Sequence, residues 1–117
     1  MCSSDLMEKV WPDLRLTVNI ATKLNRTHLT PGQVSYLLPC LGRTDEDIQK
    51  SGPQAVSMED SLSHIYGSIG TAPPPGPDVQ SETAIVAQIA KATLDPNAKL
   101  KWDDWIGNYD QIGRAHV

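Results

Sequence analysis

Two segments of the chain show the hydrophobic patterning of β-strands. Apolar and polar side chains alternate along residues 14–21 (LRLTVNIA), a stretch rich in β-branched residues and apolar enough for a central strand of a parallel sheet. A second apolar run at 34–38 ends at Pro39 and predicts another short strand. Residues 54–58 and 62–66 are further short strand candidates. The first half of the chain is therefore predicted to be mainly strand and loop.

The second half shows helical periodicity. Ser81 is a predicted N-cap for a helix over residues 82–94, whose apolar side chains fall on one face. A second amphipathic helix is predicted to begin near Trp102 and to continue to Asp110. The acidic stretch 45–49 predicts a single helical turn. Strands mixed with helices indicate an α/β fold class, although no doubly wound unit is complete.

Composition narrows the function classes. The 117 residues suit one domain, and the formal net charge of −4 argues against a nucleic-acid-binding surface and a polybasic membrane patch. Neither an apolar run of membrane-spanning length nor a secretory leader is visible. Cys2 and Cys40 are too few for a disulfide framework or a zinc site, so we expect reduced thiols and a cytoplasmic location.

The two ends of the chain resemble translated adapter DNA. The hexapeptides at 1–6 and 112–117 can be encoded by reverse-complementary strings that resemble a short-read sequencing adapter, and Gln111 fits the codon at the junction. We therefore expect residues 1–6 and 112–117 to be adapter artefacts. On this interpretation residues 7–111 are an internal fragment of a longer gene.

Four sequence blocks carry a resemblance to a known family. They are ATKLNRTH from Ala21, LLPCLGRTD from Leu37, VSMEDS from Val56 and SETAIVA from Ser81. In order and spacing they resemble the alpha (molybdopterin) subunit of formate-dehydrogenase-like molybdopterin oxidoreductases. The resemblance that they carry extends over nearly all of residues 7–111.

The resemblance implies a parent enzyme several times longer than this chain. Such a parent would bind molybdenum through two molybdopterin guanine dinucleotides, with a 4Fe-4S cluster near its missing N-terminal part, and would act on a small-molecule substrate by two-electron chemistry. The fragment would be part of the cofactor-binding domain, an incomplete Rossmann-like sheet with helices. The family's metal-ligand position and cluster cysteines lie outside it, so no catalytic or metal residue transfers and the fragment is expected to be inactive alone. The resemblance implies neither a nucleic-acid nor a membrane partner, and it leaves the electron partner undetermined.

The loop after the first strand is the candidate cofactor-binding segment. In the family it lies near the pterin, consistent with ligands that sit beyond the carboxyl ends of strands in α/β sheets. Hydroxyl and amide groups would come from Thr22, Asn25 and Thr27, and phosphate charge would be neutralised by Lys23 and Arg26. The alternative is an Asx-type turn with solvated cations.

Other constellations favour structural roles. Asp60, Ser61, Ser63 and His64 contain the residue types of a hydrolytic triad, but they lie too close in sequence for its geometry and lack a G-x-S-x-G turn. Cys40 is interpreted as a small buried apolar residue. The competing function class is a small non-enzymatic interaction domain that presents the Trp-rich helix to a partner.

Overall fold

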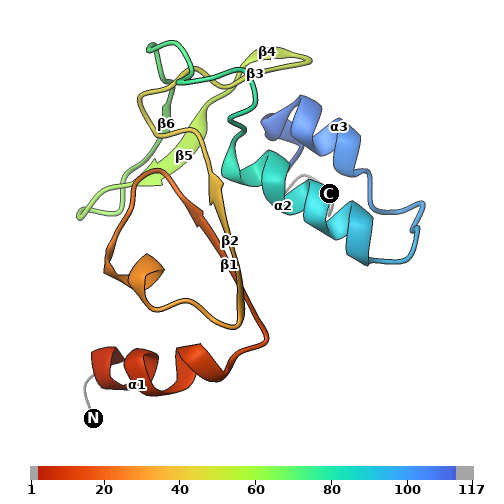
Figure 1. Ribbon diagram of the computed structural model, residues 1–117. Coiled ribbons are helices and arrows are strands. Elements are labelled where there is room, and N and C mark those ends of the chain that lie inside the picture. Colours follow the sequence, from red (N-terminus) through yellow and green to blue (C-terminus); the bar gives the residue numbers. More distant parts are fainter. Residues whose placement is uncertain (1–2, 113–117) are drawn as a thin grey trace. The chain divides into compact units, whose positions relative to one another are not determined.

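The computed structural model describes the backbone of residues 3–112 and the side chains of residues 7–112 (Figure 1). The chain divides into two compact units, residues 1–40 and residues 41–117, and each is described by itself. No helix within the described residues is long and apolar enough to cross a membrane.

The first unit is built around a parallel pair of strands (Figure 1). Its elements in order are α1 (Ser3–Val10), the 3-10 helix η1 (Trp11–Asp13), β1 (Leu16–Ala21), the 3-10 helix η2 (Arg26–Leu29) and β2 (Val34–Pro39). The two strands pair in parallel, from Leu16 opposite Val34 to Ala21 opposite Pro39. Both strand predictions from the hydrophobic pattern are therefore confirmed.

A glycine closes the connection that returns the chain to β2. The amide of Gly32 donates to Thr17 Oγ1 at 3.1 Å, and the amide of Gln33 donates to the carbonyl of Leu14 at 2.8 Å. A Cβ on Gly32 would lie 2.7 Å from that Leu14 oxygen, so a larger residue would force the turn apart. This close approach leaves Thr17 buried beneath the turn.

One face of the β1–β2 pair is largely apolar. The strand register places three side chains of β1 beside three of β2, and we call this set the apolar face: Leu16, Val18, Ile20, Val34, Tyr36 and Leu38. Val18 is 46% exposed and Tyr36 is 57% exposed. Parallel sheets are normally covered by helices on both faces, so a face of this composition is expected to pack against a helix.

The second unit contains two small antiparallel pairs. Strands β3 (Ile48–Gln49) and β4 (Gly52–Pro53) form one pair, and β5 (Val56–Glu59) and β6 (Ile65–Ser68) form the other. The strands expected at 54–58 and 62–66 are thus present, but they begin two and three residues later than predicted.

The predicted helical turn at 45–49 is wrong. Asp45 forms a parallel bridge with Ala72, and the end of the segment enters β3. Gly52 adopts a φ of 107°, which turns the chain tightly enough for β4 to pair with β3. Backbone pairing across this turn outweighs the weak helical preference of a short acidic stretch.

Two helices complete the second unit. The helix α2 (Glu82–Thr93) begins at the predicted N-cap, where Ser81 Oγ accepts from the amide of Ala84 at 3.3 Å. The helix α3 (Trp102–Gly107) contacts α2 and is followed by the 3-10 helix η3 (Tyr109–Gln111). The expected continuation to Asp110 is interrupted at Asn108, where the backbone is extended and the side chain caps η3.

Removal of the α2 cap gives a measurable prediction. Ser81→Ala deletes the oxygen that accepts from the Ala84 amide, which costs about 1 kcal/mol for an N-cap. Amide exchange in the first turn of α2 is expected to accelerate about fivefold. Ser57→Ala on exposed β5 is the control and should leave these rates unchanged. Equal exchange in Ser81→Ala and the unaltered chain would contradict the assigned cap.

Candidate functional site

The candidate cofactor loop leaves the carboxyl end of β1 and enters η2. Asn25 Oδ1 accepts from the amide of Thr27 at 2.9 Å and from its hydroxyl at 2.5 Å. The amide of Asn25 donates to Nδ1 of His28 at 2.9 Å, which completes a capping box. Asn25 and Thr27 therefore use their polar atoms to fix the loop, as the Asx-turn alternative describes. The sequence pattern alone did not indicate that His28 belongs to this cap.

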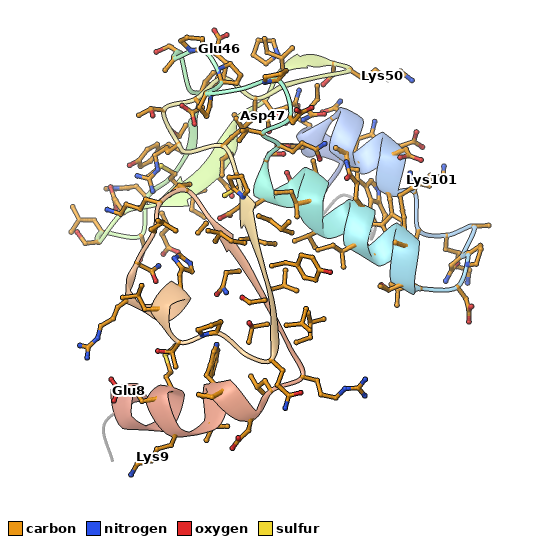
Figure 2. The ribbon with its side chains drawn as sticks, viewed as in Figure 1. Glu8, Lys9, Glu46, Asp47, Lys50 and Lys101 are labelled. Carbon is orange, nitrogen blue, oxygen red and sulfur yellow. The ribbon has the colours of Figure 1, made fainter. Side chains whose placement is uncertain are left out.

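The two loop cations are exposed. Arg26 Nη2 lies 3.3 Å from Glu8 Oε1, and their side chains are 84% and 58% exposed (Figure 2 labels Glu8). An ion pair this exposed contributes at most about 1 kcal/mol. A phosphate could therefore replace Glu8 as the partner of Arg26 at little cost. Within the described residues, Thr22 and Lys23 are exposed and Lys23 has no ion-pair partner. The capped loop thus presents two cations and a hydroxyl at the carboxyl end of a parallel strand.

A second polar cluster lies in the second unit, and no sequence pattern indicated it. The Tyr109 hydroxyl donates a short hydrogen bond to Asp47 Oδ2 and lies 2.6 Å from Ser81 Oγ. Asp47 Oδ1 accepts from Gln49 Nε2 at 2.6 Å. Gln54 Oε1 accepts from the backbone amide of Tyr109 at 2.9 Å. We call Asp47, Gln54, Ser81 and Tyr109 the polar cluster.

The polar cluster has a structural role, because its hydrogen bonds hold separate elements of the second unit together. Asp47, Gln54 and Ser81 are buried, and Figure 2 marks Asp47 near β3 and β4. Burial, followed by the hydrogen bond to Asp47, raises the pKa of Tyr109 above its ordinary value of 10.0. The hydroxyl therefore remains protonated at neutral pH and donates to the carboxylate. The cluster joins the start of α2 and η3 to the chain around β3 and β4.

The residues that suggested a hydrolytic triad form a turn between β5 and β6. Asp60 Oδ1 accepts from the amides of Leu62 at 2.8 Å and His64 at 3.1 Å, and Asp60 Oδ2 lies 3.2 Å from His64 Nδ1. Ser63 has a φ of 62°, which completes the tight turn. Within the described residues no serine hydroxyl is hydrogen-bonded to His64, so the structural interpretation of this turn is confirmed.

The Asp60 turn predicts an acid-sensitive carboxylate. Hydrogen bonds from the backbone of His64 and then of Leu62 lower the pKa of Asp60 below its ordinary value of 3.8. The stabilisation of the turn by the Asp60 carboxylate is therefore present above pH 3.8. It is lost as the pH falls through the lower pKa that Asp60 has in the folded chain. NMR titration of the Leu62 and His64 amides is expected to report a midpoint below 3.8. A midpoint at or above that value, or an unchanged turn in Asp60→Ala, would contradict the assignment.

The remaining candidates pack within their own units. The Trp102 and Trp105 rings meet edge to face with centroids 5.3 Å apart, and both side chains are half-buried. Cys40 is buried, as expected from the sequence. The described residues contain no group of three or more His, Cys, Asp or Glu side chains arranged to hold a metal ion.

Similarity to longer bacterial proteins extends along most of the chain. Protein YdeP of Shigella flexneri is 50% identical over 99 residues, which are 85% of this chain and 13% of that protein. Protein YdeP of Escherichia coli strain K12 is 48% identical over 99 residues, which are again 85% of this chain and 13% of that protein. The chain is similar to one segment of these proteins. A protein of Mycobacterium tuberculosis strain H37Rv named "Uncharacterized oxidoreductase Rv2900c" is 43% identical over 100 residues, 86% of this chain and 13% of that protein.

The chain therefore spans about one eighth of the length of the curated relatives it matches. No family model matches the sequence. No solved structure matches it either.

Proposed function

We propose that the chain is a segment of a larger oxidoreductase and contributes part of its cofactor pocket. The observation that carries the proposal is the 43% identity to the mycobacterial oxidoreductase-named protein along 86% of the chain. An identity of this size, spread over nearly the whole chain, is expected from a shared structural segment with a shared role. The finer part of the proposal is that the cofactor is molybdenum bound by molybdopterin guanine dinucleotides, as the sequence resemblance implies.

The loop fits a phosphate-bearing cofactor. Lys23 and Arg26 are exposed at the end of β1, and Thr22 adds an exposed hydroxyl. Arginine can bind a phosphate in a bidentate manner, and lysine supplies a compact charge. In this arrangement Lys23, Arg26 and Thr22 would hold the cofactor, while Asn25 and Thr27 keep the loop in shape. When bound, the molybdenum centre would supply two-electron transfer, for which the described residues offer no ligand cluster of their own.

A chimaeric protein tests the role of the loop. We define the chimaera as Escherichia coli YdeP in which this chain replaces the matched 99-residue segment. Lys23→Glu combined with Arg26→Glu is expected to lower the molybdenum and guanine-nucleotide content per purified polypeptide, because two attractions to phosphate become repulsions. Lys99→Glu with Lys101→Glu is the charge-matched control on another exposed loop. Equal cofactor content in both double variants would contradict a binding role for the loop.

A further inference from the structure

The described part of the chain exposes many large apolar side chains. In the first unit they include Leu16, Val18, Val34 and Tyr36, each about half exposed. Contiguous exposed apolar patches often mark surfaces that contact another protein element.

The apolar face is the part of this surface with the most defined geometry. Its six side chains lie on two adjacent strands in a fixed register, and the Tyr36 hydroxyl is the one polar group among them. Leu16 and Val34 are 54% and 50% exposed. The opposite face of the pair is different, since Thr17 is buried there beneath the Gly32 turn.

We propose that the apolar face is a docking surface for an amphipathic helix from the remainder of a longer polypeptide. This rests on the proposed function in one respect, namely that the chain is a segment of a larger protein. The relatives contain about eight times the length of the matched segment, so most of their sequence is available to cover this face. A helix is the element that packs on a parallel sheet, and apolar residues at i, i+3, i+4 and i+7 would match the two strands.

Thiol labelling in the isolated chain and in the chimaera tests this surface. Val18→Cys and Tyr36→Cys place single thiols on the apolar face, and Lys99→Cys is an exposed control outside it. Labelling by a maleimide is followed site by site by peptide mass spectrometry, which separates these thiols from native Cys40. In the chimaera both face thiols are expected to react at least about tenfold more slowly than in the isolated chain diluted until it no longer associates, with Lys99→Cys unchanged.

Each alternative gives a distinct result. Equal labelling of the face thiols in the chimaera and in the isolated chain would overturn the proposal. Protection in the chimaera that is lost when the chimaera is diluted would also overturn it, by assigning the face to a second copy. Protection in a chimaera that lacks molybdenum would support the docking surface and count against the proposed cofactor. A chimaera that contains molybdenum but does not protect the face thiols would support the proposed cofactor and overturn the docking surface.

Discussion

The isolated chain is expected to associate and to lack one sharp thermal transition. Exposed Val18 and Tyr36 lie on a largely apolar face, and exposed apolar patches of this kind favour association with other molecules. A two-state domain of this length would unfold with an enthalpy of about 80 kcal/mol. Calorimetry is expected to give less than about half of that value, and sedimentation is expected to show concentration-dependent association.

Substitutions on the apolar face separate association from general instability. Val18→Lys with Tyr36→Lys is expected to reduce the sedimenting oligomer, because two charges interrupt the apolar surface. Leu29→Lys alters an exposed apolar residue on η2, outside the face, and is expected to have little effect. A monomer that melts in one cooperative transition with the full enthalpy would refute this view of the chain.

The second large effect concerns the polar cluster. Tyr109→Phe removes the hydroxyl that donates to the buried Asp47 carboxylate and contacts Ser81. A hydrogen bond to a charged, buried acceptor is worth about 2 kcal/mol, and Asp47 would lose it without a replacement. Amide exchange around η3 and the first turn of α2 is expected to accelerate about thirtyfold in the chimaera.

Tyr36→Phe is the matched control for this substitution. The Tyr36 side chain is 57% exposed and belongs to the other unit, so its hydroxyl removal should leave η3 and α2 unchanged. Because the pKa of Tyr109 is raised above 10.0, the contribution of its hydroxyl should be complete below that pH and should disappear as the pH rises through the folded value. Similar exchange rates in both variants would show that the cluster does not hold these elements.

Local patterns predicted the elements whose cause is local. The alternation in LRLTVNIA marked β1, and Ser81 followed by an apolar-periodic stretch marked the start of α2. The turn at 45–49 was wrong because Asp45 pairs with Ala72, a partner that no short window contains. Helical periodicity through Tyr109 also missed the break at Asn108, where a side-chain cap starts a new turn.

The loop at residues 22–27 and the polar cluster differ in how far apart their residues lie in the sequence. Loop residues 22–27 are consecutive, so their order alone indicated both a cap and a cationic surface. The polar cluster joins Asp47 to Tyr109 across 62 positions and Ser81 to Tyr109 across 28 positions. Hydrogen bonds of that sequence separation have no local signature, and a tyrosine in an apolar stripe looks like any other core residue.

Metal and nucleotide analysis of the purified chimaera tests the central claim most directly. If the chain is a segment of a molybdopterin oxidoreductase, molybdenum and guanine nucleotide should copurify with the chimaera in a fixed ratio to protein. Both should fall together in the Lys23→Glu, Arg26→Glu variant. A folded chimaera that contains neither molybdenum nor guanine nucleotide would contradict the account.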